Sequence, residues 1–110
     1  PLASGILTGK YAGGVPADSR MALGQYKFLR DGLESEAGQA QVAKARELAA
    51  IASELECTLA QLAIAWCLTN EHVSSVILGA SRASQLTENL ASIARVPAKP
   101  EHAQMCCRVR

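Results

Sequence analysis

A short apolar run that passes directly into a helical pattern, over residues 73–89, constrains this chain more than any other feature. The run VSSVIL at 73–78 is uncharged and rich in β-branched residues, which is typical of a strand buried on both faces of a parallel sheet. Gly79 and Ser81 follow, and an amphipathic pattern over 82–93 begins at once. We therefore predict a strand, a glycine turn and a helix.

The predicted turn is a candidate anion site. A helix N-terminus presents unpaired N–H groups and a partial positive charge, which together favour a phosphate. Lys10 and Arg20 lie far upstream, and folding could bring them to the same place. The alternatives stay open from the residues alone, because Ser81 could be an ordinary N-cap and both cations could be ordinary surface charges.

Two helices are predicted before the strand. The pattern over 39–55 places apolar residues at spacings of three and four: Val42, Ala45, Leu48, Ala49, Ala52 and Leu55. Thr58 and Gln61 then have the spacing of a capping box ahead of an apolar helix at 59–68. Since that helix is apolar on nearly every side, we expect it to be covered all round, with Trp66 in the core.

The order of the predicted elements indicates a fold class. Residues 1–11 have the composition of a strand exit, and a loop of roughly thirty residues follows, a length that is typical of lids and binding loops. The predicted order is therefore strand-end, loop, helix, helix, strand and helix. This order is typical of the α/β class with a parallel sheet. Such sheets bind ligands at the carboxyl ends of their strands, where both the loop after Pro1 and the turn at 79–81 would lie.

Charge and cysteine usage exclude several classes. The net charge of +1 excludes a strongly basic nucleic-acid binder, and no apolar run approaches the 18 residues or so of a membrane span. The four cysteines have neither CxxC nor Cys/His metal spacing, so we expect no metal site and a reducing, cytoplasmic setting. Because the chain starts at Pro1 without an initiator Met, we expect a fragment of a longer protein.

Four segments of the chain resemble the C-terminal part of the aldo-keto reductases. They are PLASGILTGKY at 1–11, VPADSR at 15–20, CTLAQLAIAWCL at 57–68 and VSSVILGASRASQLTENL at 73–90. Within that family they are most similar to the cytoplasmic beta subunits of voltage-gated (Shaker-type) potassium channels. The resemblance implies the C-terminal part of a (β/α)8 TIM barrel over 1–95, holding the end of strand 7, a long loop, two helices, strand 8 and helix 8. Residues 96–110 would form a divergent, irregular tail.

The resemblance also implies a function and a site. The family reduces aldehydes and ketones by hydride transfer from NADPH, with catalytic residues in the first half of the barrel, so we assign none here. By position, the residues along the cofactor's pyrophosphate are Pro1, Leu2 and Ser4. Lys10 and Arg20 would hold its phosphates. The residues around the 2′-phosphate and the adenine are Gly79, Ser81, Gln85, Glu88 and Asn89.

Three readings of this resemblance stay open. The chain could be the NADPH-binding portion of a carbonyl reductase. It could instead belong to a regulatory module, a homotetramer docked on the alpha subunit of a voltage-gated potassium channel with NADPH as redox sensor. It could also be a truncated fragment with no activity of its own, and we expect the isolated chain to bind NADPH weakly or not at all.

Overall fold

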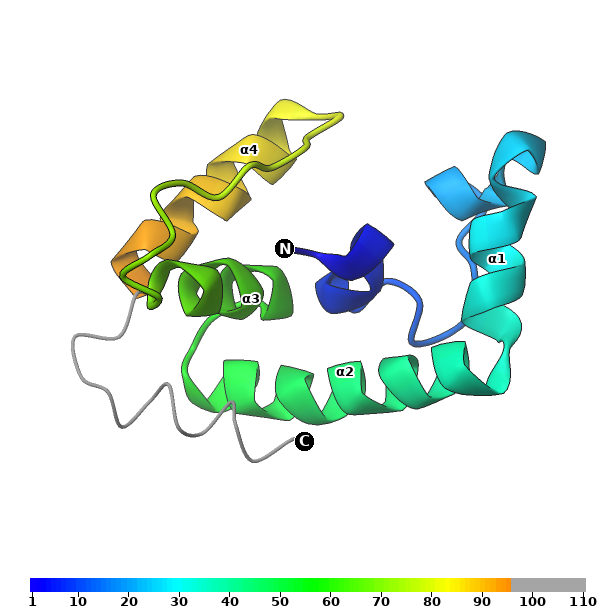
Figure 1. The fold of residues 1–110 in the computed structure, drawn as a ribbon, viewed down its shortest axis with the longest axis horizontal. Helices are drawn as coiled ribbons and strands as arrows, with labels where there is room; N and C mark the ends of the chain where they lie inside the picture. The colour runs from blue at the N-terminus through cyan, green and yellow to red at the C-terminus, as the bar shows by residue number, and fades with distance from the viewer. Residues whose placement is uncertain (96–110) are drawn as a thin grey trace.

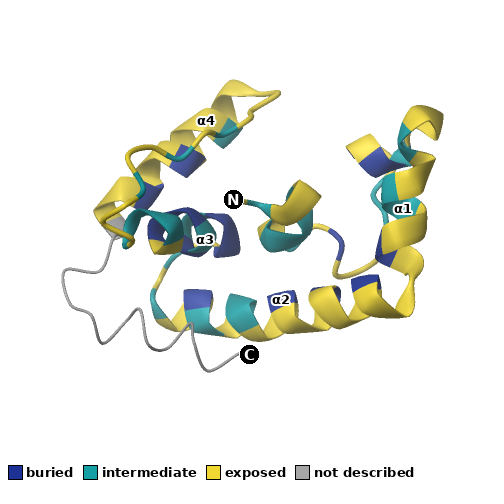
Figure 2. Cartoon of the chain, viewed as in Figure 1, coloured by how far each residue is buried: buried dark blue, intermediate teal, exposed yellow. Residues whose placement is uncertain are grey.

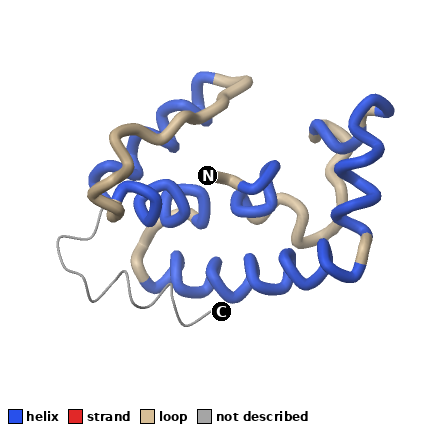
Figure 3. The backbone as a smooth tube through the Cα atoms, viewed as in Figure 1, coloured by secondary structure: helices blue, strands red, loops and turns tan. Residues whose placement is uncertain are grey.

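Helices make up all the regular structure in a computed structural model of the chain, which describes residues 1–95 (Figure 3). The predicted tail at 96–110 lies outside these residues. The α-helices are Lys27–Glu34 (α1), Glu36–Glu54 (α2), Leu59–Leu68 (α3) and Ala83–Leu90 (α4). The short 3-10 helices are Ala3–Thr8 (η1), Arg20–Ala22 (η2), Gly24–Tyr26 (η3) and Ala91–Arg95 (η4).

Helix α2 is the base on which the other elements are arranged (Figure 1). Helix α1 rises from one of its ends, α3 and α4 stand over the other, and η1 lies between these two arms. The contacts agree with this view, because α2 packs against α1, η1 and α3, and α3 packs in turn against η1, α4 and η4. Elements from both ends of the chain therefore meet at α3.

The start of α2 follows from its sequence. Ser35 is the N-cap, and its hydroxyl accepts a hydrogen bond from the Gly38 N–H at 3.2 Å, which satisfies one of the helix's unpaired donors. Helices α1 and α2 approach each other closely at Gly38, since a Cβ there would overlap the carbonyl oxygens of Gly32 and Leu33. The predicted apolar stripe is confirmed where it faces the core, at Val42, Ala45 and Ala52.

Helix α3 has the bounds and the capping box that the sequence predicts. The Gln61 N–H donates to Thr58 Oγ1 at 3.2 Å, and the Thr58 N–H donates to Gln61 Oε1 at 3.1 Å. The expectation that Trp66 lies in the core is wrong, because its side chain is 51% exposed. The packing of α2, η1, α4 and η4 buries other positions of α3 and leaves this one open to solvent.

The predicted strand at 73–78 is wrong, and the α/β class fails with it. The segment has no regular structure, and Ile77 is 86% exposed instead of buried. A strand needs a neighbour that pairs with its N–H and carbonyl groups, and residues 1–95 contain no strand to supply one. The predicted strand exit at 1–11 is also wrong, since η1 occupies it. The described residues therefore do not contain strand 7 and strand 8 of a (β/α)8 barrel.

The core lies on the inner side of the base helix. Tyr11, Met21, Leu33 and Val42 form its main cluster, and Ile6, Val15 and Leu29 pack against it. Figure 2 shows buried positions along the inner side of α2 and exposed ones along its outer side. The loop at 11–21 is thus held down by its own apolar residues, and this fixes the segment that carries Lys10 and Arg20.

None of the helices within residues 1–95 is both long and apolar enough to span a bilayer alone, and α2 with α3 has that length and composition only as a pair bent by 87°.

Candidate functional site

The first three predicted cofactor residues lie in or directly before a left-handed turn. Pro1 and Leu2 precede it, and the Leu2 carbonyl accepts hydrogen bonds from the Gly5 and Leu7 N–H groups at 2.9 and 3.3 Å. Three consecutive residues have positive φ: Ala3 (46°), Ser4 (55°) and Gly5 (98°). Only glycine adopts this region without steric cost, so Ala3 and Ser4 are held there by the surrounding fold.

Lys10 lies directly behind this turn. Its ammonium nitrogen is 5.0 Å from the centre of the Tyr11 ring, a cation–π distance. The side chain also crosses close to Gly5, where a Cβ would come within 2.9 Å of Lys10 Cε and 3.2 Å of Nζ. The absence of a side chain at Gly5 therefore makes room for the lysine, which stays exposed.

Arg20 is the first residue of η2 and is exposed. Its guanidinium carbon is 5.7 Å from the centre of the Tyr26 ring. Neither Arg20 nor Lys10 has a carboxylate partner within the described part of the chain, where Lys27 and Asp31 form the single ion pair. Both cations thus keep donors that an anion could use.

Ser81 presents two donors to one oxygen. Its backbone N–H donates to Gln85 Oε1 at 2.8 Å, and its hydroxyl donates to the same atom at 3.1 Å. The two donors therefore converge on one position just before α4. In this structure the position is occupied by Oε1 of the Gln85 side chain, which accepts both hydrogen bonds.

The start of α4 differs from a simple serine cap. The N-cap is Arg82, whose side chain makes no capping hydrogen bond, and Ser81 lies one residue before it. Ser81 is therefore not the N-cap of α4. Gly79 is exposed, and a Cβ there would meet nothing within 4 Å. The turn into α4 thus has open space at Gly79.

The other two predicted residues lie further along α4. The Glu88 carbonyl accepts a hydrogen bond from Gln61 Nε2 at 3.1 Å, which ties α4 to α3, while its side chain is exposed. Asn89 is only 6% exposed, and its carbonyl accepts from Ser92 Oγ at 2.6 Å. Asn89 therefore belongs to the packed side of α4.

The structure brings part of the predicted set to one helix. The turn η1, which carries Ser4 and precedes Lys10, packs against α3, and α4 packs against α3 as well. Arg20 lies elsewhere, because η2 packs against α1 and η3 in the other arm (Figure 1). The predicted residues thus form two groups around α3, with Arg20 apart from both.

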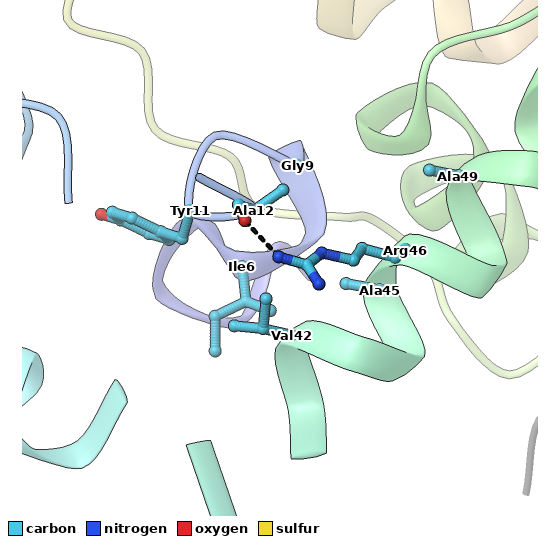
Figure 4. A pocket seen from close by; sticks show the side chains of 8 residues that line it. All are labelled: Ile6, Gly9, Tyr11, Ala12, Val42, Ala45, Arg46 and Ala49. Atoms are coloured by element: carbon cyan, nitrogen blue, oxygen red, sulfur yellow. Dashed lines mark hydrogen bonds between the residues drawn. The ribbon is translucent and has the colours of Figure 1, made fainter. Parts of the chain in front are cut away.

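The residues alone did not point to a small pocket between the first loop and α2. It has a volume of about 90 Å³ and is lined by Ile6, Gly9, Tyr11, Ala12, Val42, Ala45, Arg46 and Ala49. Figure 4 shows the Arg46 guanidinium at this pocket, donating to the Ala12 carbonyl, and the Tyr11 ring directed away from it. In the sequence, the signal for this pocket is that Arg46 directly follows Ala45, a residue of the apolar stripe that faces the core.

Two buried hydroxyls lie near the same loop, on Tyr11 and Ser19. Neither has a hydrogen-bond partner among residues 1–95, at a cost of roughly 1–3 kcal/mol each. The same residues contain no group of three His, Cys, Asp or Glu side chains that could hold a metal ion.

A comparison with protein-family models gives one match to this chain. The model described as "Aldo/keto reductase family" covers residues 1–109. The match spans both groups of predicted residues, the η1 turn and the start of α4.

Proposed function

Since this chain belongs to the aldo/keto reductase family, we propose that it holds the phosphate-bearing end of NADPH in an oxidoreductase that reduces aldehydes or ketones. The family as a whole uses a nicotinamide cofactor and a carbonyl substrate. The choice of NADPH over NADH is our inference from the residues at the start of α4.

The convergence of two Ser81 donors on one oxygen carries this proposal. A phosphate oxygen that displaced Gln85 Oε1 would meet the Ser81 N–H and hydroxyl, which now donate at 2.8 and 3.1 Å. Hydrogen bonds to a charged acceptor contribute about 1.5–3 kcal/mol each. The partial positive charge at the start of α4 adds about 0.3–1 kcal/mol. The residues present therefore fit a 2′-phosphate.

The two free cations support the same ligand. Lys10 Nζ and the Arg20 guanidinium are exposed, and each rests on an aromatic ring and has no carboxylate partner in residues 1–95. A dinucleotide with a 2′-phosphate carries several negative charges along its length. Lys10 would contact it as a point charge beside η1. Arg20 lies in the other arm, so its planar fork of donors would serve only another part of the same ligand.

The role of this chain in the reaction is to bind and orient. NADPH, when bound, supplies the hydride that reduces a carbonyl carbon. Pro1, Leu2 and Ser4 would lie along the pyrophosphate, and Gln85, Glu88 and Asn89 near the adenosine. None of the described residues is assigned as the proton donor, so we place the proton transfer outside this set.

A titration of the 110-residue chain tests the proposal. Adenosine 2′,5′-bisphosphate and adenosine 5′-monophosphate differ only in the 2′-phosphate. We expect weak binding, with amide chemical shifts changing at Ser81 and Lys10, and at least about tenfold tighter binding of the bisphosphate, the difference that one charge-assisted contact makes.

Matched variants show whether the named donors are responsible. Ser81→Ala should reduce the preference for the 2′-phosphate, whereas Lys10→Ala should weaken the binding of both nucleotides, because Lys10 lies beside the turn assigned to the pyrophosphate. Lys27→Ala is the control, because Lys27 is a cation already paired with Asp31 at 2.6 Å. Equal binding of the two nucleotides to the wild-type chain would refute the proposal.

The second candidate is regulation of a voltage-gated potassium channel. The resemblance of residues 1–11 and 73–90 to the cytoplasmic beta subunits supports it, with NADPH as the redox sensor and a homotetramer as the assembly. In this case the location would be cytoplasmic, consistent with cysteines that lack metal or CxxC spacing. Co-sedimentation with the cytoplasmic part of such a channel tests it, and an absence of binding at micromolar concentration would exclude it.

A further inference from the structure

The Tyr11 ring lies against the exposed side chain of Lys10. The two residues are adjacent in the chain, yet Lys10 is exposed while Tyr11 is only 3% exposed. The ring belongs to the core cluster with Met21, Leu33 and Val42. Lys10 Nζ lies 5.0 Å from the ring centre, within the range in which a cation is attracted to a ring face. A flexible cation therefore rests on an aromatic ring that the core keeps in place.

Gly5 gives both side chains room to meet. A Cβ at this position would come within 2.9 Å of Lys10 Cε and 3.2 Å of Tyr11 Cε2. The lysine stem and the edge of the ring therefore share the space beside Gly5, which has φ 98° in the left-handed turn. Thr8 connects the same residues, because its hydroxyl donates to the Gly5 carbonyl at 2.7 Å and accepts from the Lys10 N–H at 3.5 Å. The turn, the lysine and the ring are thus linked to one another.

The hydroxyl of Tyr11 does not account for these contacts. It is buried and has no hydrogen-bond partner among residues 1–95. Figure 4 shows the ring directed away from the pocket in which Arg46 donates to the Ala12 carbonyl, so this hydrogen bond holds the loop from another side. The ring face is what Tyr11 offers to Lys10, and a phenylalanine would offer the same face.

An aromatic ring suits an anion site better than a carboxylate would. A carboxylate beside Lys10 would hold the ammonium in place, but its negative charge would also repel an incoming phosphate. Within residues 1–95 Lys10 has no such partner, and the ring attracts it through a quadrupole that carries no net charge. The ammonium is thus held and still available to an anion.

We propose that Tyr11 is a positioning residue that orders Lys10 for the pyrophosphate of a dinucleotide. This inference rests on the proposed function, in which Lys10 contacts the cofactor phosphates. A free lysine side chain loses rotamer freedom when it binds an anion, and a lysine that already rests on a ring loses less. Ordering one such side chain in advance contributes roughly two- to tenfold in affinity. Tyr11 acts through Lys10, because its own ring is buried.

Nuclear magnetic resonance of the 110-residue chain tests the contact itself. Protons that lie over a ring face resonate upfield, so the Lys10 Hε resonances should lie upfield of those of Lys44, an exposed lysine of α2. Tyr11→Phe should keep this displacement, and Tyr11→Leu should abolish it. Equal Hε positions for the two lysines in the wild-type chain would overturn the proposal, whether or not Tyr11→Leu folds.

Titration with adenosine 5′-diphosphate, which carries a pyrophosphate, measures the effect on binding. Tyr11→Leu should weaken binding roughly two- to tenfold, and Tyr11→Phe should retain the affinity that Tyr11→Leu loses. In a Lys10→Ala background, Tyr11→Leu should cause no further loss, because the ring acts through the lysine. An equal loss in both backgrounds, or a loss in Tyr11→Phe as large as in Tyr11→Leu, would refute the positioning role.

The same titration separates this inference from the proposed function. If Lys10→Ala binds adenosine 5′-diphosphate as tightly as the wild-type chain does, the assignment of Lys10 to the cofactor phosphates is wrong. If Lys10→Ala weakens binding and a folded Tyr11→Leu does not, the role of Lys10 stands and only that of Tyr11 is refuted.

Discussion

The N–H and the hydroxyl of Ser81 both donate to the side-chain carbonyl oxygen of Gln85, at 2.8 and 3.1 Å. Gln85 is the third residue of α4, so it bridges back over the first turn in the way that a capping-box side chain does. The same oxygen occupies the position where we propose that a phosphate binds. A single residue thus both stabilises the helix start and competes with the ligand.

Substituting Gln85 by glutamate separates these two roles. A carboxylate would still accept from Ser81, and its charge in the first turn of α4 should raise the free energy of unfolding by about 0.3–1 kcal/mol. The same charge would repel a 2′-phosphate, so the preference for adenosine 2′,5′-bisphosphate should disappear. Urea denaturation and nucleotide titration of the variant measure the two effects. Unchanged or tighter binding of the bisphosphate by the Gln85→Glu variant would argue against a phosphate at this position.

Removing Arg46 should loosen the first loop from α2. The guanidinium donates to the Ala12 carbonyl across 34 positions of the chain and lies at the pocket of Figure 4. Because the side chain is exposed, we expect Arg46→Ala to lower the free energy of unfolding by only about 1 kcal/mol. Lys44→Ala, at another exposed position of the same helix, should change it by less than about 0.5 kcal/mol. Equal losses in both variants would show that the contact with Ala12 contributes nothing.

The helices of this fold could be predicted from local signals. Spacing of apolar residues located α2, and the pair Thr58 and Gln61 located the start of α3, because periodicity and capping are encoded within a few residues. The apolar pattern over 39–55 begins three residues after the true start of α2 at Glu36, because the cap, Ser35, lies before the apolar stripe.

The strand could not be predicted correctly from such signals. An uncharged β-branched run such as 73–78 is compatible with a buried strand, but a strand also requires a neighbour, and the composition of one segment does not reveal whether it has one. The sequence predicted which types of residue would bind a phosphate, but it did not predict which of these residues would lie close together in the fold. Lys10 follows η1 and Ser81 precedes α4, and both of these helices pack on α3, whereas Arg20 lies in the other arm; only tertiary packing decides this.

Ser4→Gly should stabilise the protein. Ser4 has φ 55°, a left-handed conformation that costs a residue with a Cβ about 1–2 kcal/mol. Glycine removes this cost and adds some unfolded-chain entropy, so we expect a net gain of about 0.5–1 kcal/mol by urea denaturation. Ala50→Gly is the control with the opposite expected effect. Because Ala50 is exposed within α2, glycine there should lower the free energy of unfolding by about 0.5–1 kcal/mol. A loss in Ser4→Gly would mean that the side chain makes a contact worth more than the strain.

Gly38→Ala should be the most damaging of the small substitutions. A Cβ at this position would overlap the backbone carbonyls of Gly32 and Leu33, which cannot move away as a flexible side chain could. Helices α1 and α2 would have to separate, so we expect a loss of roughly 1–3 kcal/mol in the free energy of unfolding, as for other overpacked sites. Gly13→Ala is the matched control, because a Cβ there meets nothing within 4 Å, and it should cost less than about 0.5 kcal/mol. If the two variants unfold at the same urea concentration, the close approach of α1 and α2 at Gly38 is not present in solution.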